Sequence, residues 1–283
     1  MDNRLSIMQW NCQGMQAKYE SLKILIEEKT PICISLQETL LKQKILCPRD
    51  YLFHHTDYDE QRDSHGCAVL IRKDVAHTRL TLQTDLQAVA VQMFIKRKYT
   101  ICSIYLPPNR SSHDLLRDLR VLVSQLPRPF LILGDFNGRH PLWGDVVSNS
   151  RGNAIYPFIE EQELAILNSG EPTHYHVQTG TFSVIDLSLC SPDCFLDFSW
   201  YVMDEGLGSD HFPIFIDIVD EIATPRSPRW LLDKANWALF RTLTFLEIDI
   251  EDFQSVDDAL DLLSKVIIDA AQKTIPQTSG KLI

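Results

Sequence analysis

The strongest constraint in this sequence is an apolar run, Phe130-Leu131-Ile132-Leu133, that ends in Gly134-Asp135-Phe136-Asn137. A continuous apolar run of this length is typical of a strand buried on both faces of its sheet. The acid and the amide that follow would lie where the strand leaves the core, and the strand would hold them rigidly. Gly134 would let another backbone or a substrate come close. The alternative is an ordinary Asp-x-Asn turn after a strand. Only the residues elsewhere in the chain can distinguish a functional site from such a turn.

Composition supports one large domain or two small ones. Of the 283 residues, 45% are hydrophobic and 23% are charged, which is enough for a sizeable core. No apolar run approaches the roughly 18 residues of a membrane-spanning helix, and residues 1–10 lack the features of a signal peptide. The seven cysteines are odd in number and several lie in apolar runs, so we expect packed, reduced thiols. We therefore expect an intracellular protein without a membrane association.

The net charge of −11 argues against a protein that coats nucleic acid with a basic surface. It leaves open an enzyme that grips a few phosphates locally. A carboxylate-rich site for a divalent metal would itself add negative charge.

Hydrophobic periodicity before residue 220 predicts many short strands and a few helices. Strands are predicted at 5–10, 32–36, 67–71, 78–82, 88–95, 99–106, 130–133, 165–167, 181–189, 200–203 and 212–219. Helices are predicted at 17–29 and 153–163, with another between Ser111 and Pro127, whereas 41–65 is interpreted as a long surface segment. Short connections between 67 and 106 favour antiparallel pairing. This mixed order predicts an α/β (α+β) protein with a two-layer sheet sandwich flanked by helices.

The character of the chain changes near residue 220. Residues 223–228 resemble a linker, and 234–246 and 257–275 are predicted helices. We therefore expect one domain at 1–221, followed by a linker and helical segment at 222–283.

Polar residues recur where the predicted strands end, and such ends can share one edge of a mixed sheet. They are Asn11, Glu38, Tyr105, Asp135, Asn137, Asn168, Asp210 and His211, with Asp186 inside the predicted 181–189 strand. An acid inside an apolar strand is costly unless it is paired. Each residue also has a plainer interpretation, as a turn asparagine, a core tyrosine, a loop histidine or a solvent-facing glutamate. Together they favour a site that binds metal, orients water and donates to phosphate.

The ordered set Trp10-Asn11, Gln37-Glu38, Tyr105-x-Pro, Gly134-Asp135-Phe136-Asn137, Ile185-Asp186 and Ser209-Asp210-His211 resembles the endonuclease/exonuclease/phosphatase superfamily. That resemblance covers residues 5–219 and implies a DNase I-like, four-layer α/β/β/α sandwich of two mixed sheets. The extension through His140-Pro141-Leu142-Trp143-Gly144 resembles the endonuclease of non-LTR (LINE-type) retrotransposons. The tail from Pro228 is similar to the segment that leads to a reverse transcriptase in such polyproteins, and no reverse transcriptase is present in this chain.

The resemblance implies a role for each matching residue. Glu38 would bind Mg²⁺, with Asn11 and Asp210 near the ion and Mn²⁺ as an alternative ion. Asp135 would orient or deprotonate the attacking water, and Asn137 would fix Asp135 or the phosphate. His211 would donate to phosphate while Asp186 holds its imidazole, and Tyr105 would contact the phosphate or the leaving group. Candidate substrate contacts are Asn168, Thr181, Arg139 and Asn109.

One position departs from the repair enzymes of the superfamily. Many of these carry an acid two residues after the first asparagine, where this chain has Gln13. This departure favours the retrotransposon branch, and it leaves open whether the site binds one metal ion or two. The resemblance implies a Mg²⁺-dependent endonuclease that nicks one strand of double-stranded DNA in the nucleus, leaving a 3′-hydroxyl that primes reverse transcription. The alternatives are an apurinic/apyrimidinic repair endonuclease, a phosphatase and a catalytically idle, domesticated binding protein.

Overall fold

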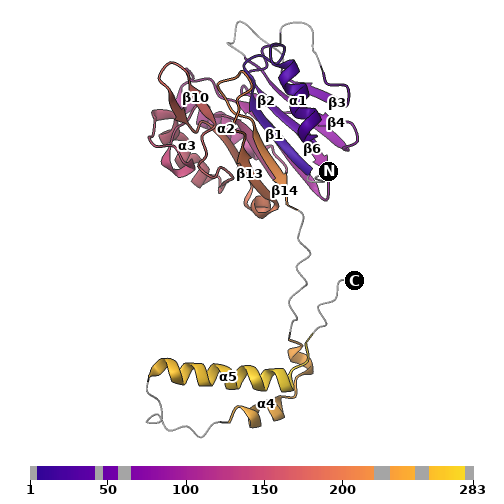
Figure 1. Cartoon of the computed structure of the whole chain (residues 1–283), viewed down its shortest axis with the longest axis vertical. Coiled ribbons are helices and arrows are strands. Elements are labelled where there is room, and N and C mark those ends of the chain that lie inside the picture. Colours follow the sequence, from indigo (N-terminus) through magenta and orange to yellow (C-terminus); the bar gives the residue numbers. More distant parts are fainter. Residues whose placement is uncertain (1–4, 42–46, 57–64, 220–229, 246–254, 278–283) are drawn as a thin grey trace. The chain divides into compact units, whose positions relative to one another are not determined.

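The computed structural model describes residues 5–41, 47–56, 65–219, 230–245 and 255–277 (Figure 1). The chain divides into two compact units, Met1–Asp220 and Glu221–Ile283. Within the described residues, no helix is both long enough and apolar enough to pass through a bilayer.

The first sheet of the Met1–Asp220 unit has six strands in the order β13-β14-β1-β2-β4-β3. Its strands are β1 (Leu5–Asn11), β2 (Cys33–Gln37), β3 (Tyr51–His55), β4 (Cys67–Arg72), β13 (Phe198–Val202) and β14 (Ile214–Ile218). Only the β1–β2 pair is parallel within this sheet. Helix α1 (Tyr19–Lys29) covers its outer face, where Leu22 and Leu25 pack with Trp10 and Phe215.

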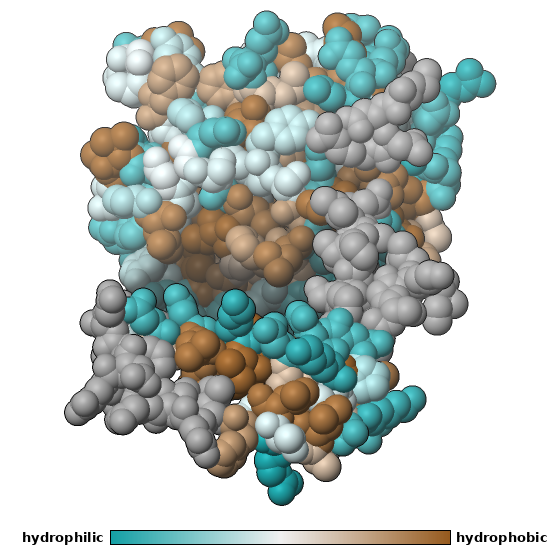
Figure 2. Space-filling view, turned by 60° about the horizontal axis from the view of Figure 1, so that its bottom comes forward, coloured by the Kyte–Doolittle hydropathy of each residue, from teal (hydrophilic) through white to brown (hydrophobic). Residues whose placement is uncertain are grey.

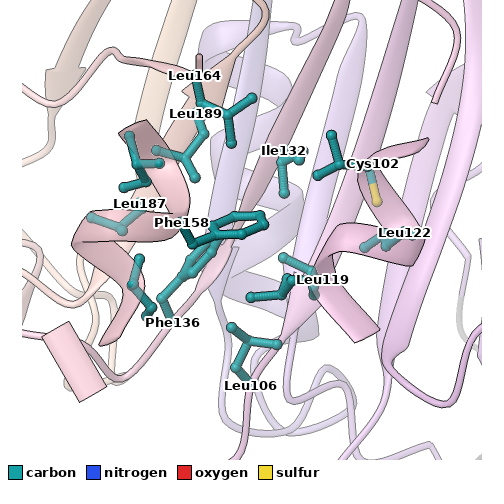
Figure 3. Close-up of a cluster of buried hydrophobic side chains, with 14 of the residues drawn as sticks. Cys102, Leu106, Leu119, Leu122, Ile132, Phe136, Phe158, Leu164, Leu187 and Leu189 are labelled. Carbon is teal, nitrogen blue, oxygen red and sulfur yellow. The ribbon is translucent and has the colours of Figure 1, made fainter. Parts of the chain in front are cut away.

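The second sheet also has six strands, in the order β5-β6-β7-β8-β12-β9. Its strands are β5 (His77–Leu80), β6 (Gln87–Phe94), β7 (Lys98–Tyr105), β8 (Phe130–Asp135), β9 (Ala165–Ile166) and β12 (Asp186–Cys190). Here β7 and β8 form the parallel pair. Helices α2 (Ser112–Ser124) and α3 (Ser150–Glu161) cover the outer face through the cluster drawn in Figure 3, in which Leu119 of α2 and Phe158 of α3 lie over Ile132.

The two sheets pack face to face. Apolar side chains such as Ile7, Val91, Ile101 and Leu133 fill the interface between them. The arrangement is a four-layer α/β/β/α sandwich of two mixed sheets, so the predicted fold class is confirmed.

Two buried glutamines join the sheets beneath the strand ends. The amide of Gln9 donates to the carbonyl oxygens of Gly134 and Leu187 at 3.2 and 3.3 Å. The amide of Gln37 donates to Ser103 Oγ at 3.0 Å. Because unpaired buried amides are costly, these bonds fix the relative register of the sheets immediately below the residues of interest.

The predicted strand 181–189 is wrong, because the segment forms two strands. These are β11 (Thr181–Ser183), which pairs with β10 (His174–His176) in a separate hairpin, and β12. Between them the backbone N–H groups bond to side chains: Val184 donates to Asp145 Oδ2, and Ile185 and Asp186 donate to Thr173 Oγ1. A backbone bonded in this way cannot continue a ladder. Asp186 therefore begins a strand, where we expected it in the middle of one.

Two other expectations need correction. The segment 41–65, interpreted as surface without strands, contains the edge strand β3. Helix α3 begins at Ser150, before the predicted residue 153, because the side chain of Asn149 accepts a hydrogen bond from Gly152 N at its N-terminus.

The Glu221–Ile283 unit contains α4 (Trp237–Leu243) and α5 (Val256–Thr274), which pack against each other. Short 3₁₀ turns lie at Pro141–Trp143, Pro192–Asp197 and Leu232–Lys234. The predicted linker 223–228 lies outside the described residues, and the predicted domain boundary at residue 221 stays a prediction.

Candidate active site

The predicted strand-end residues meet at one edge of the sandwich because of how the strands run. Asn11 and Tyr105 are the last residues of β1 and β7, and Asp135 is the last residue of β8. Strand β12 runs antiparallel to β8, so its first residue, Asp186, lies in register with Asp135. His211 precedes β14, which runs antiparallel to β1. Parallel strands thus contribute their ends and antiparallel strands their beginnings.

Asn11 joins the two halves of the site. Its amide nitrogen donates to Glu38 Oε1 at 3.1 Å and to Asp135 Oδ2 at 3.0 Å. Its amide oxygen accepts a hydrogen bond from Gln13 N at 3.2 Å. The network fixes the orientation of the amide, because only a nitrogen can donate to two carboxylates. Asn11 therefore presents a donor to both acids, and its predicted place near a metal ion stays a prediction.

Several loops just past the strand ends adopt an unusual backbone conformation. Gln13, Glu38 and Asn137 have φ values of 44°, 49° and 53°. Non-glycine residues rarely adopt positive φ, and such conformations cluster at functional sites. At Gly134, an added Cβ would lie 1.9 Å from Ile104 O, so the close approach allowed by this glycine is to the backbone of β7.

His211 lies at the centre of a buried charge cluster. Its Nδ1 lies 2.8 Å from Asp186 Oδ2, while its Nε2 lies 3.6 Å from Asp210 Oδ1 and 4.0 Å from Asp135 Oδ2. Burial lowers the pKa of His211, but the carboxylates of Asp186, Asp135 and Asp210 outweigh this effect and raise the pKa to about 10. The imidazole is therefore a cationic donor at neutral pH.

The pKa of Asp135 is shifted toward a value suited to proton transfer. Its burial raises the pKa, and the charges of Asp186 and Glu38 raise it further, while His211 lowers it, with a result of about 7. The backbone N–H of Asn137 donates to Asp135 Oδ1 at 2.9 Å and holds the carboxylate in place. A general base is most effective when its pKa lies near the working pH.

Tyr105 is 3% exposed and lies close to the Glu38 carboxylate. Burial, together with the charges of Glu38 and Asp135, raises the pKa of Tyr105 far above its ordinary value, so the hydroxyl stays protonated. The ring stacks on His65, with centroids 5.3 Å apart, and His65 Nδ1 lies 3.5 Å from Glu38 Oε2.

The predicted substrate contacts lie outside this cluster. Asn168 bonds to the backbone of β12 through both ends of its amide, at Asp186 O and Ser188 N. Arg139 forms a two-pronged ion pair with the buried Asp145. Thr181 lies exposed on the β10–β11 hairpin, hydrogen bonded to Thr179 Oγ1, and Asn109 is exposed in the turn after β7. The side chains of Asn168 and Arg139 are thus engaged in bonds within the fold, and their roles in substrate binding stay predictions.

Sequence reasoning missed two histidines at the site. His65 lies in the segment that we interpreted as surface, and no periodicity marked it. His174 lies in β10, which we did not predict, and its ring contacts His211 with centroids 4.7 Å apart. The pattern His174-x-His176 next to a polar turn was the available signal for this second residue.

Several side chains could hold a metal ion. Two tight groups of acid and histidine ligands occur among the described residues: Asp135, Asp186 and His211, and His174, Asp210 and His211. Glu38 lies outside both groups, with its side chain 17% exposed. The buried oxygens Asp186 Oδ1 and Asp210 Oδ1 have no hydrogen-bond partner among the described residues. Carboxylate oxygens without partners fit a hard divalent cation.

Residues 99–215 match the family described as "Endonuclease-reverse transcriptase". The chain is 26% identical over 284 residues to the RNA-directed DNA polymerase from mobile element jockey of Drosophila melanogaster, which covers 96% of this chain and 31% of that protein. It is 27% identical to the probable RNA-directed DNA polymerase from transposon X-element of the same species, over 95% of this chain and 30% of that protein. The chain thus spans just under a third of the length of these relatives.

Two solved structures have a similar fold. The endonuclease domain of TRAS1, a telomere-specific non-LTR retrotransposon, matches with a TM-score of 0.65 and 21% identity, over 77% of this chain and 99% of that one. The chain is therefore similar in sequence to the endonuclease-reverse transcriptase family over residues 99–215, and similar in fold to the endonuclease domain of a non-LTR retrotransposon. The AP endonuclease LMAP from Leishmania major also has a similar fold, with a TM-score of 0.62 and 12% identity over 77% of this chain and 88% of that one.

Proposed function

We propose that the Met1–Asp220 unit is a Mg²⁺-dependent endonuclease that nicks one strand of double-stranded DNA and leaves a 3′-hydroxyl to prime reverse transcription. The observation that carries the proposal is the buried pair of His211 and Asp186 beside Asp135, which Asn11 links to Glu38. A cationic donor, a carboxylate with a raised pKa and a further acid stand together at one edge of the sandwich. Phosphodiester hydrolysis needs these three kinds of group.

Each side chain has a part in the proposed reaction. Asp135 accepts the proton of the attacking water, which its pKa near neutrality suits. His211 donates through Nε2 to a non-bridging phosphate oxygen, while Asp186 fixes the imidazole through Nδ1. Tyr105, as a protonated phenol, donates to the phosphate or the leaving group.

Glu38 and Asp210 would hold the divalent ion, which when bound would neutralise charge on the phosphate and stabilise the leaving oxygen. Asn11 supports Glu38 and Asp135 by donating to both carboxylates. Asn137 supports Asp135 through its backbone N–H and the loop through its amide, which donates to Leu106 O at 3.2 Å.

The proposed partners follow from the relatives. Because these are named RNA-directed DNA polymerases and the chain spans 31% of the first of them, we propose that a reverse transcriptase domain works together with this unit. The substrate would then be nuclear DNA, and cleavage would take place in the nucleus. The β10–β11 hairpin, with Thr181, and the turn that contains Asn109 are the proposed places of DNA contact near the site.

A second candidate is a repair-type apurinic endonuclease, which the structural similarity to the AP endonuclease LMAP favours. Supercoiled plasmid and an oligonucleotide with one abasic site separate the two activities, each assayed with Mg²⁺ and with EDTA. We expect Mg²⁺-dependent nicking of undamaged plasmid, at ends that a DNA polymerase can extend. Cleavage of the abasic oligonucleotide alone would support the repair activity, and DNA binding without turnover would support an idle binding protein.

A further inference from the structure

His174 is a titratable side chain at the site that the proposed reaction does not use. Its Nε2 lies 3.7 Å from Asp210 Oδ2, and His211 Nε2 lies 3.6 Å from Asp210 Oδ1. One ligand atom from each of these three residues falls within 4.8 Å of the others. In a tetrahedral zinc site with Zn–N bonds of about 2.0–2.1 Å, neighbouring ligand atoms are about 3.4 Å apart. Each histidine Nε2 is within a few tenths of an ångström of this separation from one oxygen of Asp210, His174 from Oδ2 and His211 from Oδ1, so both imidazoles face the same carboxylate.

Both imidazoles have their other nitrogen engaged. His174 Nδ1 lies 3.0 Å from Ser183 Oγ, and His211 Nδ1 lies 2.8 Å from Asp186 Oδ2. Histidines that bind metals generally use one nitrogen for the ion and the other for an oxygen behind it, which fixes the tautomer and the direction of the ring. Here both free nitrogens, each an Nε2, lie near the same carboxylate.

The carboxylate itself is incompletely satisfied. Asp210 Oδ1 is buried and has no hydrogen-bond partner among the described residues. The backbone holds the group together, because His174 forms a β-bridge with His211 and Tyr175 N donates to Asp210 O at 2.8 Å. The three ligands are thus positioned before any ion binds.

We propose that His174, Asp210 and His211 form a site for Zn²⁺ or a similar borderline cation, and that its occupancy inhibits the nuclease. Two imidazoles and one carboxylate suit such an ion, whereas Mg²⁺ prefers oxygen ligands alone. An ion on His211 Nε2 displaces the proton that this nitrogen would otherwise donate to phosphate, and the proton is released to solvent. The inhibition rests on the proposed function, but the ion binding does not.

Another histidine pair provides a matched control. His54 Nε2 and His77 Nε2 lie 2.9 Å apart, between strands β3 and β5, and this pair is where adventitious two-ligand binding would take place. The seven cysteines are free, and six of them are buried, so they are a second source of background.

Co²⁺ reports the site in the full chain without any nuclease assay. After removal of metals with EDTA, Co²⁺ titration should give visible d–d bands of nitrogen and oxygen ligation, and Zn²⁺ should abolish them at one equivalent. In His174→Phe, which keeps an aromatic ring against His211, we expect affinity to fall at least about tenfold. Asp210→Asn should also lower the Co²⁺ affinity, and Ser183→Ala should lower it by a smaller factor. His77→Phe should bind Co²⁺ with the affinity of the wild type. Circular dichroism shows which variants are folded.

Several results would overturn the proposal. The first is equal Co²⁺ affinity in the wild type, His174→Phe and Asp210→Asn. The second is loss of binding in His77→Phe alone, and the third is a thiolate charge-transfer band in place of the expected spectrum.

Zn²⁺ inhibition of Mg²⁺-dependent nicking then tests the functional step, with each variant normalised to its own zinc-free rate. The concentration for half inhibition should rise in His174→Phe by the same factor as the dissociation constant, and an unchanged value would refute the inhibitory role. If Zn²⁺ binds as expected but the chain never nicks DNA, the proposed function fails while the metal site stands.

Discussion

At the scale of single residues, the site depends on how one buried histidine is surrounded. Asp186, Asp135 and Asp210 lie within 4.0 Å of the His211 ring nitrogens. An isolated buried imidazole would lose its charge, whereas these carboxylates keep it cationic. Burial, with the charges of Asp186 and Glu38, raises the pKa of Asp135 to about 7 despite the opposing charge of His211, so a donor and an acceptor are both present near neutral pH.

Asp186→Asn tests the orientation of His211. An amide can still hydrogen bond to Nδ1, but it removes the charge that stabilises the imidazolium and can select the wrong tautomer. We expect kcat for plasmid nicking to fall at least about 100-fold, with a smaller change in KM. Asp193→Asn, an exposed acid that follows the opposite end of β12 from Asp186, is the matched control. A nicking rate of Asp186→Asn within a few-fold of the control would contradict the role.

Much of the site was predictable at this scale, because a buried apolar strand followed by a polar residue leaves few places for that residue. Asn11, Glu38, Asp135 and His211 do meet, as the sequence led us to expect. The orientation of the Asn11 amide was not predictable, because it depends on Gln13 N and on two acids from other strands. His174 was missed because its contacts come from a hairpin whose strands are too short for periodicity to mark.

At the scale of elements, the N-terminus of α3 ties the loops of the site together. The side chain of Asn149 bonds to Arg139 N and Asn137 O in the loop after β8. Arg151, which is 5% exposed, donates to Pro107 O, Pro108 O and Arg110 O in the loop after β7. The predicted strand 181–189 failed for a related reason, since Thr173 and Asp145 take the backbone bonds that would have continued it. Side-chain bonds between distant segments are not visible in a local pattern.

Asp145 gives an element-scale prediction about acid stability. Burial raises the pKa of Asp145, but Arg139 and the backbone N–H groups of Val184 and Val147 outweigh it and hold the pKa below the ordinary value of 3.8. Because the folded pKa is the lower one, its stabilisation is complete above about pH 4 and is lost as the pH falls through the folded value. Asp145→Asn should lower the free energy of unfolding by about 1–3 kcal/mol at pH 6.

The measurement is urea unfolding of the wild type and Asp145→Asn between pH 6 and pH 3, with Asp193→Asn as the control. The difference between the wild type and Asp145→Asn should stay constant down to about pH 4 and shrink below it. A difference that grows as the pH falls would mean that the sign of the shift is wrong.

At the scale of the whole molecule, the two sheets with their helices form a self-contained core. The clusters on both outer faces and between the sheets consist of residues from the Met1–Asp220 unit. The Glu221–Ile283 unit leaves large apolar side chains exposed, among them Trp237, Phe245 and Leu260. Figure 2 shows several hydrophobic patches among hydrophilic residues on the face in view.

Truncation after residue 221 tests the domain boundary. Because the core lies in the first unit, we expect the fragment to stay folded without aggregating and to nick DNA within a few-fold of the full chain. Thermal unfolding, size-exclusion chromatography and plasmid nicking measure these properties. Aggregation of the fragment, or loss of its cooperative unfolding, would show that the C-terminal residues belong to the core.

The charge of the whole chain makes a prediction about salt. A protein with a net charge of −11 must hold DNA through a few local basic or polar contacts, and screening weakens such contacts. We expect kcat/KM for nicking to fall steeply between about 50 and 200 mM NaCl at constant Mg²⁺. A rate that is independent of salt would contradict phosphate contacts of this kind.

The central claim is that Asp135 acts with His211 in phosphodiester hydrolysis, and single-turnover nicking of supercoiled plasmid by Asp135→Asn tests it most directly. The substitution keeps the shape of the side chain but removes the carboxylate that accepts the proton. With Mg²⁺ present and the fold verified by circular dichroism, we predict a rate at least about 100-fold below that of the wild type and of Asp193→Asn. A folded Asp135→Asn variant that nicks at the wild-type rate would contradict the account.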